Sequence, residues 1–453
     1  MQITVSLTFD LETSQNLDEV ETLILEAGRR AMRQALELAV REIEESRRAC
    51  PACGGETRIG GSESRVVLAT FGRVALRLRR LVCLECGESF RPADAFVSCL
   101  EGANVSGRLR DAAILAGSSW PYETAASVLQ QLCGARISDE TVRQVTNAAG
   151  KAEASLQLAE AKRVVEPSLE EAKAEEEREL ATRLAAKGAP VGPRLLVVGL
   201  DGGWIPSRDT PGGMEGKVGV IAVDPRPIGK TVEGKVSRHR LSSRRYVASF
   251  AGSREIGMLA YSAASELGVE RASRQVVLGD GAEWIKSQAK AHFPDALTIL
   301  DWAHVARIVH KAVRKARPGK SFQAERRGLH QSVADALWHG QTDSAIERLR
   351  ALRPQAEPGE EAREPIKALE EAIAYLEAQR PWLGDYQALR DQGYPVGSGM
   401  VEREVELVIN RRMKRQGMRW RRENADAVVA LRTNTINADW ADSTTQPPQK
   451  QAA

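Results

Sequence analysis

Hydrophobic residues in the second half of the chain fall into short runs, and three of these runs end at an aspartate. The runs and the acids that follow them are residues 194–200 with Asp201, 275–278 with Asp280, and 296–300 with Asp301. Short apolar runs of this kind predict buried strands, and ligands collect beyond the carboxyl ends of strands in α/β sheets. Asp-Gly is also a common turn dipeptide. Because it occurs at two of the three ends, each time with a tryptophan soon after, the pattern favours a carboxylate metal site over turns alone.

The order of the predicted elements indicates a fold. Alternating residues predict strands at Lys217–Val223 and Thr231–Leu241, and helical periodicity predicts helices at Ser253–Leu267 and Ala282–His292. The resulting order β-β-β-α-β-α-β, with three antiparallel strands followed by parallel ones, is the ribonuclease H-like plan. A wholly helical pattern then follows as far as about Leu389. We therefore predict a multidomain α/β protein whose ribonuclease H-like catalytic core carries an all-helical insertion.

Four cysteines near the N-terminus form two CxxC pairs, which are Cys50 with Cys53 and Cys83 with Cys86. A hairpin pattern over residues 65–81 separates the pairs, which is the layout of a zinc ribbon. Four thiolates close a tetrahedral Zn²⁺ site and leave no open position, so the predicted zinc is structural. Two redox dithiols are the other interpretation, but they would leave the glycines after Cys53 and Cys86 unexplained.

Short helical segments follow the cysteines and resemble a helix-turn-helix. The segments are Arg108–Ala116, Tyr122–Leu132 and Asp139–Ala148, with Ser138 as the predicted N-cap of the third. In this interpretation the third helix offers Arg143, Gln144 and Asn147 to a DNA groove. Any three-helix bundle can imitate the pattern, so a purely structural bundle stays open.

These patterns predict eight segments. They are an N-terminal arm and helix (1–49), a zinc ribbon (50–100), a helix-turn-helix-like DNA-binding domain (101–150), a connecting helix and linker (151–193), the first part of the core (194–303), the helical insertion (304–392), the C-terminal core helices (393–438) and a disordered tail (439–453). The helix predicted at Leu17–Arg48 would serve packing or self-association.

Charge and composition narrow the class of protein. The 453 residues are 42% hydrophobic and 28% charged, and the net charge is only +3, yet the basic residues are clustered. Local basic tracts in a nearly neutral chain indicate polyanion-binding surfaces. The residues expected to contact DNA in these tracts are Arg307, Lys311, Arg411, Arg412, Lys414, Arg415, Arg419, Trp420, Arg421 and Arg422. Trp420 could stack on an unpaired base or pack internally. No run is long enough to span a bilayer and no signal peptide is recognisable, so we expect a cytoplasmic protein.

A third acid should join Asp201 and Asp280 from a helix beside the sheet. Glu402 is favoured, because Gly397-Ser398-Gly399 would let the helix start approach the sheet. Glu406 shares its face and is the reserve, whereas Glu404 is expected to be solvated. Three carboxylates suit Mg²⁺ or Mn²⁺, and two such ions can hold both oxygens of an in-line phosphoryl displacement.

Four motifs carry a resemblance to a known family. GLDGGWI, LGDGAEWI, ILDWAHVAR and the long segment beginning GSGMVERE resemble the insertion-sequence transposases of the ISKra type, which are DD(E/D) enzymes related to Mutator-like transposases. The resemblance covers about Arg194 to Asn437 and implies Asp201, Asp280 and Glu402 as the catalytic triad. It also implies that the Asp301–His304 segment corresponds to a [C/D]xxH motif, with His304 near the site. A structural hydrogen bond at a helix start is the other interpretation of His304.

The expected function is that of a bacterial DNA transposase, which binds its element ends and cleaves and joins DNA with Mg²⁺ or Mn²⁺. Expected partners are transposon-end DNA, target DNA and a second copy of the chain, since synapsis joins two ends. A nuclease or resolvase that cleaves without joining would use the same residues. A DNA-binding regulator without chemistry is the third possibility, although all three acids are present.

Overall fold

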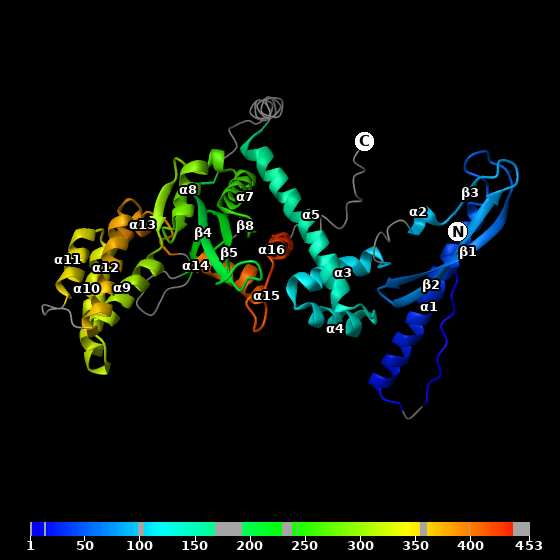
Figure 1. Ribbon diagram of the computed structural model, residues 1–453, viewed down its shortest axis with the longest axis horizontal. Coiled ribbons are helices and arrows are strands. Elements are labelled where there is room, and N and C mark those ends of the chain that lie inside the picture. The colour runs from blue at the N-terminus through cyan, green and yellow to red at the C-terminus, as the bar shows by residue number, and fades with distance from the viewer. Residues whose placement is uncertain are drawn as a thin grey trace. The chain divides into compact units, whose positions relative to one another are not determined.

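The computed structural model describes residues 2–12, 15–97, 104–167, 193–228, 238–241, 243–353, 360–397 and 399–437. The chain divides into two compact units, Met1–Ala149 and Gly150–Ala453, whose elements are labelled in Figure 1. Most of the predicted linker, the first part of the predicted strand Thr231–Leu241 and the predicted disordered tail lie outside the described residues. No helix in the described ranges is both long enough and apolar enough to cross a membrane.

A long helix and a β-hairpin form the first part of unit 1. Helix α1 (Leu17–Ser46) begins at a capping box between Asn16 and Glu19. The predicted hairpin is present as β1 (Thr57–Ala69) and β2 (Gly72–Cys83), and the short β3 (Ser89–Phe90) pairs with β2. Val40 of α1 packs with alternate residues of the hairpin in a small apolar core.

The remaining helices of unit 1 are α2 (Asp94–Val97), α3 (Gly107–Ser119), α4 (Tyr122–Cys133) and the start of α5 (Asp139–Val165). Helix α5 begins where predicted, because the Ser138 hydroxyl accepts a hydrogen bond from the backbone N–H of Thr141 at 3.1 Å. The helix continues past the predicted end at Ala148. Ala113, Ala125 and Val142 supply the buried contacts among α3, α4 and α5.

A five-stranded mixed sheet lies at the centre of unit 2, in the order β10–β9–β4–β5–β8. The strands are β4 (Leu196–Ile205), β5 (Met214–Val223), β8 (Ser243–Ser249), β9 (Gln275–Gly279) and β10 (Leu297–Leu300). Strands β4, β5 and β8 pair antiparallel, whereas β9 and β10 continue the sheet parallel to β4. The first half of β4 is buried on both faces, which explains its unbroken apolar run.

The third antiparallel strand of this sheet is not the one predicted at Thr231–Leu241, so the predicted place of that segment in the sheet is wrong. The strand beside β5 is β8, and Arg238–Arg240 instead forms β7, which pairs with β6 (Arg226–Ile228) in a separate two-stranded ribbon. The inward residues of β8 include Tyr246 and Ala248. Its first residues, Ser243–Arg245, are polar, so the strand lacks an apolar run that the sequence pattern could identify.

Helices cover both faces of the sheet (Figure 1). On one face lie α7 (Ser253–Glu266), the short η2 (Val269–Arg271), α8 (Glu283–His292) and α9 (Trp302–Ala316). On the other lie α14 (Gly399–Glu404), the π-helix η5 (Val405–Asn410), α15 (Arg411–Met413) and α16 (Arg422–Ile436). The helix predicted at Val401–Met413 is therefore present, but a π-helical segment interrupts it.

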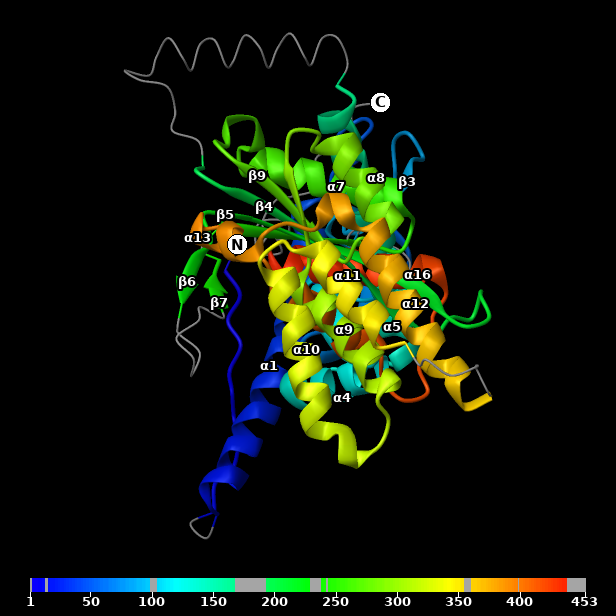
Figure 2. The same ribbon diagram turned by 90° about the vertical axis from the view of Figure 1, so that its left-hand side faces the viewer.

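The predicted helical segment between the two parts of the core is also present. After α9 come η3 (Lys320–Phe322), α10 (Gln323–Trp338), α11 (Thr342–Ala351), α12 (Glu360–Ala378), η4 (Arg380–Trp382) and α13 (Tyr386–Asp391). Figure 2 shows α9 to α12 side by side. Their buried residues join those of β4, β9 and α8 in one core, so the segment packs directly on the sheet.

Candidate functional site

Asp201 lies in β4, and Asp280 directly follows the neighbouring strand β9 at the same level of the sheet. The strand register pairs Gly199 of β4 with Leu278 of β9. Continuing it by two residues places Asp201 beside Asp280, and side chains at matched positions of parallel strands point to the same face. The register between β9 and β10 pairs Gly279 with Leu300, so Asp301 follows at the same edge. The three predicted acids are thus brought near one another, but Asp201 lies inside β4, which continues to Ile205 beyond the strand end predicted at Leu200.

The electrostatics of Asp201 indicate that these acids influence one another. The pKa of Asp201 is raised to about 6, mainly by burial and to a smaller extent by the charges of Asp280, Asp301 and Glu402, against the opposing effect of a hydrogen bond from the Gly202 N–H. That N–H donates to Asp201 Oδ1 at 2.7 Å. A carboxylate crowded by other carboxylates is stabilised by a cation.

The carboxylate of Asp301 is used in hydrogen bonds that hold the start of helix α9. It is 3% exposed, and its two carboxylate oxygens accept hydrogen bonds from the backbone N–H groups of Ala303 and His304 at 3.0 and 3.2 Å. Asp301 therefore caps α9. His304 lies in the first turn of that helix, with its ring 5.8 Å from the ring of Tyr375.

Glu402 and Glu404 have opposite environments on α14. Glu402 is about half exposed, and its Oε1 accepts from Arg307 at 2.9 Å. The expectation that Glu404 is solvated is wrong: it is fully buried, and neither carboxylate oxygen has a hydrogen-bond partner. Residues two apart on a helix point about 200° apart, so an outward Glu402 turns Glu404 toward the sheet. Burial first, and then the charge of Asp201, raises the pKa of Glu404 well above its usual range.

Two glycines of β4 allow the segment that carries Glu402 to lie against the sheet. A Cβ at Gly199 would lie 2.4 Å from Val401, and one at Gly203 would lie 2.9 Å from Val405. The prediction assigned this close approach to Gly397 and Gly399, but a Cβ at Gly399 would meet nothing within 4 Å. The glycines of the GLDGGW motif are therefore the ones that the packing requires.

The carboxylates do not form a closed cage. Among the described residues, the four cysteines are the only set of three or more His, Cys, Asp or Glu residues whose ligand atoms all lie within 4.8 Å of one another. Asp201, Asp280 and Glu402 could hold divalent ions together once Glu402 leaves Arg307. Oxygen donors of this kind suit Mg²⁺ and Mn²⁺.

Residues of the helical insertion also reach this edge, although the sequence patterns do not predict their presence there. Tyr375 Oη donates to the backbone oxygen of Asp280 at 2.8 Å, and Gln379 Nε2 donates to that of Gly281 at 3.0 Å. Tyr386 Oη donates to the backbone oxygen of Leu300 at 3.0 Å. These contacts span 86 to 98 residues of chain, and no spacing in the sequence indicates them.

The predicted DNA-binding residues of unit 2 fall into an exposed and a buried group. Those exposed to solvent are Arg307, Lys311, Arg411, Lys414, Arg415, Arg419, Arg421 and Arg422. Arg412 and Trp420 are 1% and 7% exposed, and the Arg412 guanidinium lies 4.9 Å from the Trp420 ring centre. Trp420 Nε1 donates to the backbone oxygen of Met413. Both side chains therefore lie buried at the base of the exposed loop. This burial contradicts the prediction that Arg412 and Trp420 contact DNA.

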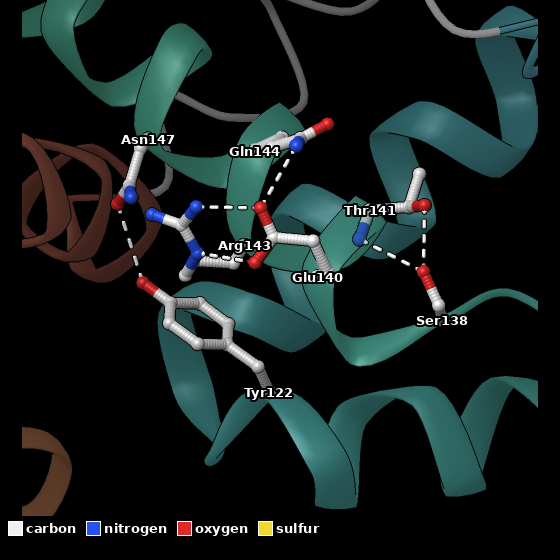
Figure 3. A network of polar contacts seen from close by, with 7 residues as sticks. All are labelled: Tyr122, Ser138, Glu140, Thr141, Arg143, Gln144 and Asn147. Carbon is white, nitrogen blue, oxygen red and sulfur yellow. Dashed lines mark hydrogen bonds and ion pairs between the residues drawn. The ribbon is translucent and has the colours of Figure 1, made fainter.

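In unit 1, the helix that is predicted to read DNA carries a network of polar side chains (Figure 3). Arg143 and Gln144 both donate to the Glu140 carboxylate, and the bonds from Arg143 and then Gln144 lower the pKa of Glu140 to about 2. Asn147 is 8% exposed and accepts from Tyr122 Oη at 3.3 Å. This burial contradicts the prediction that Asn147 reads a groove, whereas Arg143 and Gln144 are accessible.

The four paired cysteines come together at one end of the hairpin. The sulfur distances are 3.6 Å for Cys50–Cys86 and 3.5 Å for Cys53–Cys83 and Cys53–Cys86. A tetrahedral zinc site with bonds of about 2.3 Å requires sulfur separations of about 3.8 Å, so the set fits a metal ion. The backbone N–H of Cys86 helps to lower the pKa of Cys83 to about 7. Gly54 and Gly87, which follow the two pairs, have φ values of 76° and 77° and so explain the glycines there.

Comparisons with known proteins give a family but no function. Among solved structures, the Drosophila P element transposase strand transfer complex is similar at 8% identity over 57% of this chain and 68% of that chain, with a TM-score of 0.18. A score this low carries no argument. No curated protein matches the chain. The profile of one family, the Uncharacterised protein family (UPF0236), matches residues 12–445. This match spans nearly the whole chain, and the protein therefore belongs to the UPF0236 family.

Proposed function

We propose that this protein is a DNA transposase of a bacterial insertion sequence, a metal-dependent polynucleotidyl transferase with a ribonuclease H-like core. The observation that supports the proposal most is the register of β4 and β9, which pairs Gly199 with Leu278 and, when continued by two residues, brings Asp201 level with Asp280 just after β9. Glu402 lies on the helix held against β4, and its charge helps to raise the pKa of Asp201. The strand order, three antiparallel strands followed by parallel ones, supports the proposed fold.

In this function Asp201, Asp280 and Glu402 would hold two Mg²⁺ or Mn²⁺ ions, which would supply the charge stabilisation that phosphoryl transfer needs. The protein's own contribution is to orient the carboxylates and to hold the DNA backbone. Arg307 and Lys311 on the exposed side of α9, and the loop residues Lys414, Arg415 and Arg419, would bind phosphates. His304 would position the DNA near the scissile phosphate.

The front of the chain would recognise the element ends. The cysteine cluster would hold a structural Zn²⁺, and Arg143 and Gln144 would contact a groove of transposon-end DNA. Two copies of the chain would join two element ends, so the smallest active assembly would be a homodimer on DNA. This assembly would act on the DNA of the bacterial nucleoid.

One assay separates this function from its alternatives. The full chain is incubated with Mg²⁺, labelled element ends and a target plasmid, and the products are resolved on a gel. A transposase gives joined products, a nuclease or resolvase gives cleaved ends without joining, and a DNA-binding regulator gives neither. Glu402→Gln should abolish joining, whereas Glu283→Gln, which changes an exposed glutamate on α8, should not. Joining that persists in Glu402→Gln would remove Glu402 from the site.

A further inference from the structure

The turn that carries Asp280 is held from outside the sheet by helix α12. Strand β9 ends at Gly279 and α8 begins at Glu283, so Asp280 lies in a three-residue connection. Gly281 in that connection has φ +83°. Asp280 Oδ1 accepts from the Ala282 N–H at 2.9 Å, which ties the carboxylate to the same turn. The direction of the Asp280 side chain therefore depends on how the peptide groups of this turn are oriented.

Two side chains from α12 and the residue that follows it bind the two carbonyls of the turn. Tyr375 Oη donates to the Asp280 oxygen at 2.8 Å, and Gln379 Nε2 donates to the Gly281 oxygen at 3.0 Å. Tyr375 and Gln379 are four residues apart and thus share one face of the helix. A Cβ at Gly281 would lie 2.5 Å from the Gln379 side chain, so the helix end is packed tightly against the turn.

The polar chemistry of Tyr375 and Gln379 indicates that these side chains orient the peptide groups of the turn. Gln379 is 6% exposed, and its Oε1 has no hydrogen-bond partner. Burying an amide is unfavourable unless its hydrogen bonds are made, so an apolar residue would fill this position at less cost if filling were the only requirement. A tyrosine hydroxyl is protonated throughout the neutral range, so Tyr375 can donate its bond to the Asp280 oxygen there.

We infer that Tyr375 and Gln379 are positioning residues that fix the Asp280–Gly281 turn, so that the helical insertion sets the geometry of a metal-ligating carboxylate in the core. The inference rests on the proposed function, because it takes Asp280 as a ligand of divalent ions. It adds that the insertion is a working part of the metal site, through two contacts that lie 95 and 98 residues from the turn in sequence.

Mn²⁺ binding to the full chain without DNA tests this inference. The titration is followed by the electron paramagnetic resonance of free Mn²⁺, and Asp201→Asn gives the background. Tyr375→Phe keeps the ring beside His304 and removes only the hydroxyl. We expect it to weaken Mn²⁺ binding by about threefold to tenfold, the range that one neutral hydrogen bond commonly controls. Gln379→Met keeps the side-chain volume but removes the hydrogen-bond donor, and it should weaken Mn²⁺ binding to a similar extent. Saturating Mg²⁺ should restore strand transfer in both variants.

Tyr386→Phe is the matched control. It removes the same kind of bond, from a buried tyrosine to the backbone oxygen of Leu300, beside an aspartate that is not proposed as a ligand. It should lower the melting temperature about as much as Tyr375→Phe and leave Mn²⁺ binding unchanged. If Tyr375→Phe and Gln379→Met bind Mn²⁺ like the unmodified chain, the two contacts are merely structural and the inference is overturned. If the unmodified chain binds no more Mn²⁺ than Asp201→Asn, the proposed function itself fails.

Discussion

Asp201 is a carboxylate that the fold keeps partly out of water and surrounds with other acids. Its pKa is raised from 3.8 to about 6, so between these two pH values the folded state binds more protons than the unfolded state. Stability of the metal-free protein therefore falls as the pH rises through this window, and the loss is complete above pH 6. The proposed metal site would account for such a residue, because bound cations would offset the cost of the charge.

Asp201→Asn should therefore stabilise the metal-free protein at pH 8. Two pKa units correspond to about 2.7 kcal/mol, and partial solvent exposure reduces the expected gain to about 2 kcal/mol. At pH 4 the difference from the unmodified chain should nearly vanish. Denaturant unfolding at the two pH values measures it. Adding Mn²⁺ should stabilise the unmodified chain and not the variant, and equal stabilisation of both would contradict a metal site at Asp201.

Glu404 offers a second test, because it is buried without partners while Glu402 faces solvent. Glu402→Gln should lower strand transfer by about a hundredfold or more, the decrease common for a group that stabilises a transition state. Glu404→Gln should retain activity within a few fold and raise the melting temperature, since a neutral amide is buried more easily than a carboxylate. The reverse ranking in the joining assay would make Glu404 the third acid.

The residue scale also shows the limits of sequence patterns. Asp201 and Asp280 could be identified from the sequence because each follows an apolar run, which is a local feature. Tyr375 and Gln379 could not, since a hydrogen bond to a backbone oxygen 95 residues away leaves no local pattern. The burial of Glu404 depends on the rotation of α14 against β4, which the glycines of the strand decide.

At the scale of elements, the sequence predicts those whose apolar pattern is complete. The hairpin β1–β2, the helices α3 to α5 and the strands β4 and β9 have clear alternating, helical or continuous apolar patterns, and each is present near the predicted position, although α5 and β4 continue beyond their predicted ends. Strand β8 escapes prediction because it begins with Ser243-Arg244-Arg245 and is completed by contacts with α16. The π-helix η5 escapes prediction because the apolar spacing of its residues resembles that of an α-helix.

The cysteine cluster makes a prediction for the ribbon as an element. The full chain should contain one zinc ion, and Cys83→Ser should release it and lower the melting temperature of the ribbon, because structural zinc contributes folding free energy. Cys133→Ser is the matched control, since Cys133 lies outside the cluster. Elemental analysis and thermal unfolding measure both effects. Equal zinc content in the two variants would contradict the assignment.

The exposed basic loop between Met413 and Trp420 makes a prediction for DNA binding. Lys414 and Arg419 are exposed, whereas the buried Trp420 closes the loop through its hydrogen bond to the backbone oxygen of Met413. Removing one phosphate-binding side chain reduces the dependence of log affinity on log salt by about 0.9. Changing both residues to Gln should therefore reduce this slope by about 2, while Lys290→Gln on α8 should not change it. An unchanged slope in the double variant would place DNA elsewhere.

At the scale of the whole molecule, the insertion is joined to the core through polar contacts as well as packing. Tyr375 of α12 binds the Asp280 turn, and Tyr386 of α13 binds the end of β10. The backbone N–H of Trp302 also donates to the oxygen of Val396, beyond the insertion. The sheet edge is therefore built from three stretches of chain that are far apart in sequence. Binding at this edge should consequently be sensitive to changes in the insertion.

The proposed assembly of two chains on two DNA ends makes the final prediction. If joining requires an active site from each of two copies, mixing the unmodified chain with an equal amount of Glu402→Gln should leave roughly a quarter of the joined product, because random pairing gives one fully active dimer in four. A monomeric enzyme should retain about half under the same total protein concentration. The residue exchanged is half exposed and paired with Arg307 across a surface contact, so the variant should fold and pair normally. Product yield measured across several mixing ratios distinguishes a squared dependence from a linear one, and a linear dependence would contradict the dimer.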